Sequence, residues 1–170
     1  AIVDEVVGQN CFTNFYKFEL ARDKISMMLR KRQTLVEVNC EVKCSDGITL
    51  RVFVVVVSNR QENQRKLNSY IKAARVKLLR KKLTADIQAY GSKLKADNFV
   101  YDVLTNTLHK ELEKSTHKIV PHAKLEISKI KTIKRGAVDT KKLVEEYQAE
   151  GPADKQKAES PEAQNLLSKQ

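Results

Sequence analysis

The side chains of this sequence that could do chemistry are mostly cations, and many of them fall in one stretch. From Arg60 to Leu83 there are nine Lys or Arg residues and one acid, Glu62. Cations at this density repel one another unless an anion covers them, so the stretch predicts a surface that binds phosphate groups. Arg can bond a phosphate through two parallel hydrogen bonds, whereas Lys acts as a point charge. The simpler alternative is a solvated helix face with no partner.

The net charge indicates the same kind of partner. The 170 residues carry a net charge of +11, and residues 1–135 alone hold 27 basic and 14 acidic residues. A folded region with this excess favours a polyanion, which is usually nucleic acid or an anionic membrane. No apolar stretch approaches the roughly 20 residues that span a bilayer, so we expect nucleic acid and no membrane as the partner.

Residue types typical of catalysis do not occur at productive spacings. His109, His117 and His122 lack a neighbouring cysteine or carboxylate at ligand spacing, and we expect them to face solvent near a basic surface. Glu111 and Glu113 are two residues apart, so on a helix they point to different sides and cannot work as an acid and base pair. The five glycines are scattered singly and form no phosphate-binding loop. We therefore expect no enzyme, no metal site and no cofactor.

The three cysteines, at positions 11, 40 and 44, make no even disulfide framework, which is typical of a protein of the reducing cytosol. Cys40 and Cys44 fall on the same face of a predicted strand, which is a poor arrangement for tetrahedral zinc. We expect all three to be buried or inert thiols. For Cys11, in "GQNCFTNF", the residues alone leave open a nucleophile, a metal ligand and a structural role.

The elements that must position these residues include a predicted β-hairpin. Residues 35–44, "LVEVNCEVKC", alternate between apolar and polar side chains, and Asp46 with Gly47 forms a turn that tolerates positive φ. Residues 48–57 are the predicted second strand of the hairpin, and the second half of this strand is apolar on both faces. A strand of this kind predicts a sheet that is covered on both sides over part of its width. Further strands are predicted at residues 1–7 and 123–135.

Helical periodicity predicts two helices that carry cations. The first, residues 20–32, has Arg30 to Arg32 in its last turn, where cations suit the helix dipole. The second begins after Ser69 as its N-cap and ends at Gly91. The apolar side of the second helix consists of Val76, Leu79, Leu83, Ile87 and Tyr90. Its cations fall on another side, which therefore faces solvent or a partner.

Two more helices are predicted, at residues 97–115 and 139–148. From Gly151 onward the composition is dominated by Ala, Glu, Gln, Lys, Ser and Pro, which bury too little apolar surface to fold. We expect one basic α+β domain over residues 1–150 and a disordered tail over residues 151–170. The sheet should be twisted, mostly antiparallel and flanked by helices, with a closed, barrel-like form as one alternative.

The candidate RNA-binding residues follow from this arrangement of cations. They are Lys24, Arg30, Lys31, Arg32, Arg65, Lys66, Tyr70, Arg75, Lys77, Arg80, Lys81, Lys82, Lys131, Lys134 and Arg135. Tyr70 is included because it precedes the basic helix, where it can stack on a base or hydrogen-bond to it. Aromatic residues are otherwise few, and none forms the stripe of an RNA-recognition sheet. The pattern therefore favours readout of the charge and shape of a folded RNA.

Several segments, in this order, resemble a known family. "GQNCFTNFYKFELARDKISMMLRKRQTLVEVNCEVKCSDGITLRVF" begins at Gly8, "SYIKAARVKLLRKKL" at Ser69 and "KLEISKIKTIKRGAVDTKKLVEEY" at Lys124. Together they are similar to the archaeal and eukaryotic small-subunit ribosomal proteins called eS-one, or S-three-A. The resemblance covers nearly all of residues 5–150, and its motifs are the loop from Asn10, the basic helix that opens at Arg22, and the turn and strand from Asp46.

The resemblance implies a structural constituent of the small ribosomal subunit. Family members bind small-subunit ribosomal RNA on the platform, near the messenger exit, and contact neighbouring ribosomal proteins. Messenger RNA and initiation factors are further partners that this position implies. The resemblance also implies cytoplasmic ribosomes with nucleolar assembly, and it makes Cys11 a packing residue in a structural loop beside RNA.

The chain also departs from the family pattern. We expect the family's N-terminal part, a basic tail and the first strands of the sheet, to be missing, so that the sheet lacks some partners. Leu104, Thr105, Leu108 and His109 stand where the family has a helix break, which predicts two short helices fused into one. Two other functions stay open. One is a non-ribosomal basic RNA-binding factor, such as a chaperone or a nuclease-like enzyme, and the other is a protein-interaction scaffold.

Overall fold

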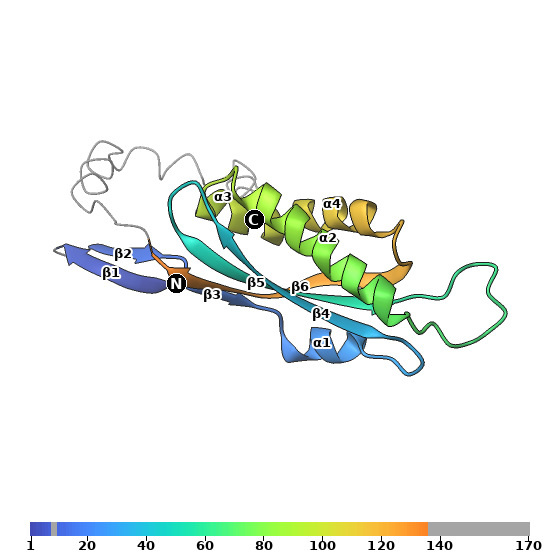
Figure 1. Ribbon diagram of the computed structural model, residues 1–170. Helices are drawn as coiled ribbons and strands as arrows, with labels where there is room; N and C mark the ends of the chain where they lie inside the picture. Colours follow the sequence, from blue (N-terminus) through green and yellow to red (C-terminus); the bar gives the residue numbers. More distant parts are fainter. Residues whose placement is uncertain (8–9, 136–170) are drawn as a thin grey trace, which may run out of the picture. The chain divides into compact units, whose positions relative to one another are not determined.

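The computed structural model describes residues 1–7 and 10–135 (Figure 1). The predicted helix at 139–148 and the predicted tail at 151–170 lie outside the described residues. The described elements, in chain order, are β1 (Ile2–Val7), β2 (Asn10–Asn14), β3 (Lys17–Glu19), α1 (Arg22–Met28), β4 (Leu35–Lys43), β5 (Thr49–Ser58), α2 (Ala73–Gly91), α3 (Ala96–Leu104), α4 (Thr107–Thr116) and β6 (His122–Lys134). Strands and helices follow one another without a repeated β-α-β unit, so the predicted α+β class is confirmed.

The predicted hairpin forms from β4 and β5. The two strands pair antiparallel from Leu35↔Val57 to Lys43↔Thr49, and Gly47 takes a positive φ of 77° in the turn. Alternate residues of β4 are buried, as the sequence pattern predicts. Val55 and Val57 of β5 are buried on the opposite face, where they pack with Met28 of α1. The second half of β5 is thus covered on both sides, which confirms that prediction.

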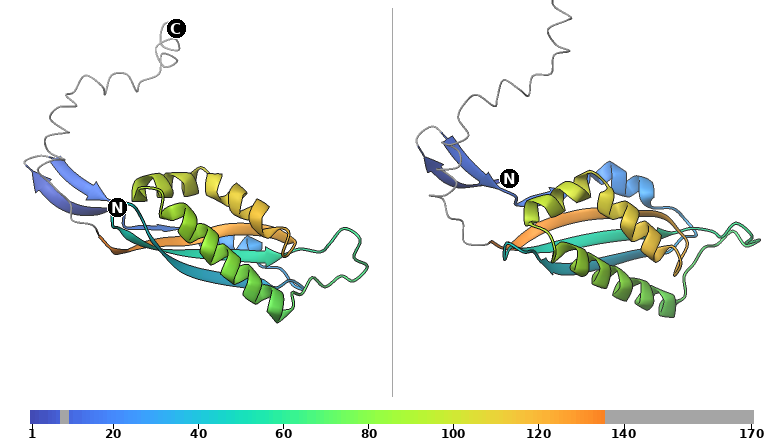
Figure 2. Two further views of the ribbon diagram at one scale, coloured as in Figure 1. Left: turned by 45° about the horizontal axis from the view of Figure 1, so that its top comes forward. Right: turned by 90° about the horizontal axis from the view of Figure 1, so that it is seen from above.

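The hairpin belongs to a four-stranded antiparallel sheet in the order β3-β6-β5-β4, and β1 and β2 form a separate two-stranded sheet. In the described part of the chain the four-stranded sheet is open, since β3 and β4 are its edges and do not pair with each other. Helices α2, α3 and α4 cover one face, and α1 lies on the other (Figures 1 and 2). The side chains at the centre of the core include Leu50, Val54, Leu79, Leu83, Ile87, Phe99, Leu108, Ile127 and Ile130.

The first helix is shorter than its sequence pattern predicts. α1 ends at Met28, because Leu29 is extended, and Arg32 adopts a left-handed conformation with φ of 66°. Arg30, Lys31 and Arg32 therefore lie in the connection to β4 and not in the last turn of a helix, so the prediction that they complement the helix dipole is wrong. The residues that would have continued the helix form the connection between α1, which ends at Met28, and β4, which begins at Leu35.

Both predicted ends of the second helix also need correction. α2 begins at Ala73, and its N-cap Lys72 makes no side-chain cap hydrogen bond, whereas the Ser69 hydroxyl donates to the Arg32 carbonyl at 3.2 Å. Gly91 is the last residue of α2 and does not have positive φ. A Cβ atom at Gly91 would clash with Val42 Cγ1. Glycine at this position allows the helix to approach β4 closely, which is a packing role and not a C-cap.

The prediction of one fused helix at residues 97–115 is wrong. The structure has two helices, α3 and α4, separated by Asn106 in a left-handed conformation with φ of 61°. Asparagine is one of the few residues besides glycine that adopts this conformation at modest cost. The break rotates the second helix, so Val103 and Leu108 are buried while Leu104 is 56% exposed. Apolar spacing by itself did not distinguish one straight helix from two.

Candidate nucleic-acid interface

Two basic connections, residues 29–34 and 59–72, are joined by hydrogen bonds at one end of the sheet. The buried Ser58 hydroxyl accepts from the Thr34 backbone N–H at 2.8 Å and donates to the Ser69 carbonyl at 2.6 Å. The Ser69 N–H donates to the Arg32 carbonyl at 2.9 Å, and the Ile71 N–H donates to Thr34 Oγ1 at 3.0 Å. These bonds hold together two segments that are 37 residues apart in the chain.

The joined connections and the start of α2 form what we call the basic end. Its cations are Arg30, Lys31, Arg32, Arg60, Arg65, Lys66, Lys72 and Arg75. All are exposed, and within the described residues none of them takes part in an ion pair. The first turn of α2 contains no acidic residue, so the positive end of its dipole adds to the local potential. The long connection extends beyond the sheet at the right of Figure 1.

The exposed side of α2 carries four more predicted cations. Two of them have hydrogen-bond or ion-pair partners, and the other two form no ion pair within the described residues. Arg80 Nε donates to the Glu37 carbonyl at 3.3 Å, and Lys82 Nζ bonds Asp86 Oδ1 at 2.7 Å. Lys77 and Lys81 are exposed and form no ion pair within the described part of the chain. Lys77 and Lys81 are therefore the better candidates for phosphate binding on this helix.

Lys131, Lys134 and Arg135 lie at the other end of the sheet. Lys134 pairs in register with Thr49, the first residue of β5, whereas the basic end follows Ser58, its last residue. At roughly 3.3 Å per residue, the 10 residues of β5 separate the two ends by about 30 Å. The predicted residues therefore do not form one continuous site.

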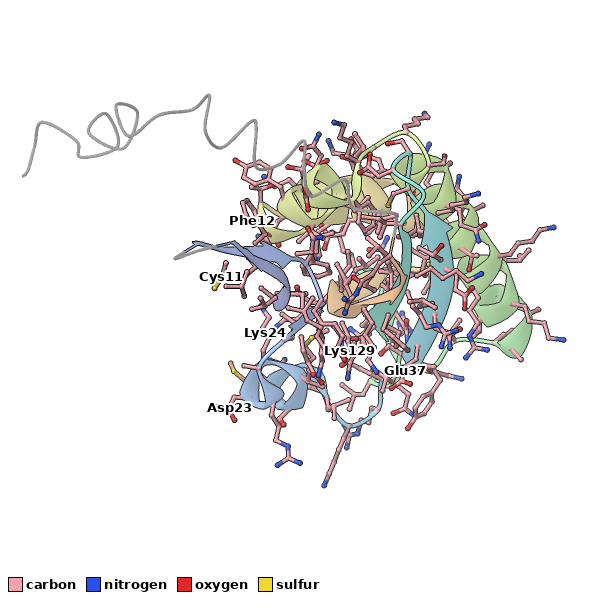
Figure 3. All side chains as sticks on the ribbon, turned by 90° about the vertical axis from the view of Figure 1, so that its left-hand side faces the viewer. Cys11, Phe12, Asp23, Lys24, Glu37 and Lys129 are labelled. Atoms are coloured by element: carbon pink, nitrogen blue, oxygen red, sulfur yellow. The ribbon has the colours of Figure 1, made fainter. Side chains whose placement is uncertain are left out.

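Lys24 is separate from both groups. Its position on α1 is labelled in Figure 3. The Nζ atom of Lys24 lies 3.0 Å from Glu126 Oε1 of β6. This ion pair joins α1 to the face of the sheet that it covers. The geometry gives Lys24 a structural contact, and its contact with RNA stays a prediction.

A groove beside the basic end contains residues that the sequence analysis missed. It lies between residues 59–72, the first turns of α2, and residues 117–121, which connect α4 to β6. Arg60, Lys72 and Lys118 are exposed there and were not selected from the sequence. The signal that could have found Arg60 is "NRQENQ" at residues 59–64, in which amide side chains alternate with charges next to the basic stretch.

His109 is buried, so the prediction that it faces solvent is wrong. Its Nε2 atom accepts a hydrogen bond from the Ile127 N–H at 3.2 Å and lies 3.7 Å from Glu126 Oε2. The Nδ1 atom has no hydrogen-bond partner within the described residues. Burial lowers the pKa of His109, and the nearby Glu126 opposes this shift in part. The neutral ring thus satisfies an N–H of β6 at a point where no other described strand pairs with that edge of β6.

The lowered pKa of His109 predicts a loss of stability in mild acid. The unfolded chain binds the proton more tightly than the folded chain, so stability is full above the ordinary pKa of 6.5 and falls as pH decreases through it. We expect the urea concentration at the unfolding midpoint to be lower at about pH 5.5 than at about pH 7.5. His109→Gln retains an acceptor for Ile127 and does not titrate, so its midpoint should depend less on pH. An equal pH dependence in both proteins would contradict this role.

The pKa shifts of two cysteines and of Glu19 have local structural causes. Cys40 and Cys44 are buried, and burial raises the pKa of Cys40 to about 11 and also raises the pKa of Cys44. These two thiols are buried, as expected, whereas Cys11 is exposed on β2 (Figure 3), in a strand where the resemblance implied a structural loop. Hydrogen bonds from Lys17 and Lys129 lower the pKa of Glu19 and keep it a carboxylate. The described residues contain no His, Cys, Asp and Glu cluster able to hold a metal ion.

Comparison with known proteins identifies the family. Residues 2–136 match the model of the Ribosomal S3Ae family. The chain belongs to this family. It is 33% identical over 171 residues to small ribosomal subunit protein eS1 of Babesia bovis, covering 98% of this chain and 64% of that protein. The chain is also 32% identical to the eS1 proteins of Plasmodium yoelii yoelii and of Plasmodium vivax (strain Salvador I).

These two comparisons cover 98% and 97% of this chain, and 65% and 64% of the relatives. The chain thus spans slightly less than two thirds of the length of the curated relatives it matches. The S3Ae match includes every described element and both connections of the basic end, which confirms the resemblance noted in the sequence. None of the helices that the structure describes has the length and apolar character needed to cross a membrane.

Proposed function

We propose that this chain is a structural constituent of the small ribosomal subunit and binds small-subunit ribosomal RNA through its basic end and α2. Membership of the S3Ae family and the similarity to proteins named small ribosomal subunit protein eS1 support the ribosomal part. The observation that supports RNA binding is the basic end itself, where the two hydrogen-bonded connections and the start of α2 carry eight exposed cations that form no ion pair within the described residues.

The basic end suits a phosphate backbone for a physical reason. Each phosphate that a Lys or Arg neutralises releases condensed counterions, which favours binding at low salt and makes the affinity fall steeply as salt increases. The hydrogen bonds at Ser58 and Thr34 hold the backbone of both connections, so less conformational entropy is lost when the cations meet RNA. Lys77 and Lys81 extend the same surface along α2. Lys131, Lys134 and Arg135 provide a second contact, about 30 Å away.

The family resemblance supports a proposed place within the subunit. The chain lies on the platform, near the messenger exit, and contacts neighbouring ribosomal proteins, with messenger RNA and initiation factors close by. It is assembled in the nucleolus, functions in cytoplasmic ribosomes and performs no catalysis. Met27, Leu29 and Leu35 are exposed apolar side chains around the end of α1, and they suit a protein neighbour better than RNA.

Sedimentation of the tagged chain from a cell lysate, at low and at high salt, tests this proposal. We expect it to migrate with the small ribosomal subunit at both salt concentrations, because an assembled ribosomal protein is held by many contacts at once. Release at moderate salt would instead indicate a non-ribosomal basic RNA-binding factor. Absence from ribosomal fractions, with partners that remain bound at high salt, would indicate a protein-interaction scaffold.

A further inference from the structure

The groove beside the basic end is large enough for a nucleotide. It consists of two adjoining hollows of about 940 and 200 Å³. Both hollows are lined by Asn59, Gln61, Arg75 and Pro121, so they adjoin each other along these residues. Sites for small molecules usually have volumes of roughly 300 to 1,000 Å³. The groove therefore has room for a base with its sugar and an adjacent phosphate.

One wall of the groove carries amide side chains in two different roles. Gln64 Nε2 donates to the carbonyls of Lys66 and Asn68 at 3.1 and 2.6 Å, which fixes the shape of the connection. Gln61 and Asn63, in contrast, make no side-chain hydrogen bond within the described residues. Each offers a donor and an acceptor together, which is the combination that the edges of unpaired bases require.

Tyr70 lies in the same groove, and its side chain is 64% exposed. The backbone on either side is held, because Ser69 bonds to Arg32 and Ser58, and the Ile71 N–H bonds to Thr34 Oγ1. An aromatic ring that is exposed while its backbone is fixed presents a face on which a base can stack without much further ordering.

The rim of the groove carries charge of both signs. Arg60, Arg75 and Lys118 are exposed and form no ion pair in the part of the chain that the structure describes, so they can neutralise the phosphates that flank a bound base. Glu62 is the one acid that lines the groove in its described part. A carboxylate would repel a phosphate, but it can accept a hydrogen bond from the exocyclic amino group of a base.

We propose that this groove binds an unpaired nucleotide of RNA. The base stacks on Tyr70 and hydrogen-bonds to Gln61 and Asn63, while Arg60, Arg75 and Lys118 hold the flanking phosphates. This inference rests on the proposed RNA-binding function and adds that the basic end recognises a looped-out or single-stranded base. An acidic protein segment fits less well, because it would have no planar ring for Tyr70 and would meet Glu62.

Binding of the full chain to two RNA probes tests this inference. The probes are a labelled single-stranded oligouridine of about 12 nucleotides and a fully paired RNA duplex of about the same length. Tyr70→Ala should weaken binding of the single strand about tenfold or more, since stacking of a base on an aromatic ring is lost. Binding of the duplex, which has no base to insert, should be unchanged. Tyr70→Phe keeps the ring and should retain the affinity for the single strand.

Tyr101→Ala is the matched control, because Tyr101 is 66% exposed on α3 and does not line the groove. It should leave both affinities unchanged. The inference is overturned if Tyr70→Ala leaves single-strand binding unchanged or weakens both probes equally. It is also overturned if a polyglutamate peptide binds the unmodified chain and Tyr70→Ala weakens peptide binding as much as it weakens single-strand binding. That result would indicate an acidic protein partner. If neither RNA binds the unmodified chain at low salt, the proposed RNA-binding function falls as well.

Discussion

Replacing Arg30, Arg65 and Lys66 together by Glu is expected to weaken RNA binding by roughly two to three orders of magnitude near 0.1 M salt. All three side chains are exposed at the basic end, and none has a partner within the described residues. Each lost phosphate contact removes about 0.7 to 0.9 from the slope of log affinity against log salt concentration. The slope of the triple variant should therefore be smaller by roughly 2 to 3. Titration of a labelled ribosomal RNA fragment at several salt concentrations measures both quantities.

A matched triple variant separates the site from the total charge. Lys93, Lys95 and Lys110 are also exposed and form no ion pair within the described residues, but they lie in and around α3 and α4. Their replacement by Glu changes the net charge equally and should weaken binding much less. Equal losses in the two variants would show that net charge, and not the basic end, governs the affinity. Circular dichroism should show the same helix content in both proteins.

Ser58→Ala is expected to lower the free energy of unfolding by roughly 2 to 4 kcal/mol. The change leaves the Thr34 N–H and the Ser69 carbonyl without the hydroxyl that bonds both, at 2.8 and 2.6 Å. Ser58 is fully buried, so water cannot readily replace the missing group. Because the same hydroxyl joins the two basic connections, the variant should also bind RNA more weakly while it is still folded. Urea unfolding followed by RNA titration below the transition measures the two effects.

Ser128→Ala provides the comparison for Ser58→Ala. Ser128 also lies in a strand, but its hydroxyl donates one hydrogen bond of 3.2 Å, to the Phe53 carbonyl, and the residue is half-buried. Its loss should cost about 1 kcal/mol or less. If Ser58→Ala were no more destabilising than Ser128→Ala, the hydroxyl of Ser58 would not be the link between the connections.

The strands were largely predictable because their signal is local and simple. Side chains alternate strictly between the two faces of a strand, so the pattern of Val36, Val38, Cys40 and Val42 specifies which face is buried. The turn was predictable from Asp46 and Gly47, since few residues tolerate the φ of 77° that Gly47 adopts. The core side of α2 also followed from its spacing, and Leu79, Leu83 and Ile87 are fully buried.

Helix ends were less predictable, since contacts distant in sequence compete with local capping. Ser69 is a good N-cap type, yet its hydroxyl bonds to Arg32, 37 residues away. His109 was expected in solvent, because the sequence does not show that β6 would present the Ile127 N–H to it. In each case a partner from another element offered a better hydrogen bond than the local alternative.

The amino-acid sequence determined the excess of positive charge, the alternation of the strands and the apolar side of α2, because each of these depends on composition or on spacing along one element. From them follow the α+β class and the expectation of a polyanionic partner. The gathering of the cations depended on folding. The antiparallel register of β5 with β4 and β6 sets which connections share an end of the sheet. Ser69 therefore hydrogen-bonds to Arg32 at one end, while Lys134 lies at the other end, about 30 Å away. That register, with the hydrogen bonds of the buried Ser58, turns scattered Lys and Arg residues into one surface.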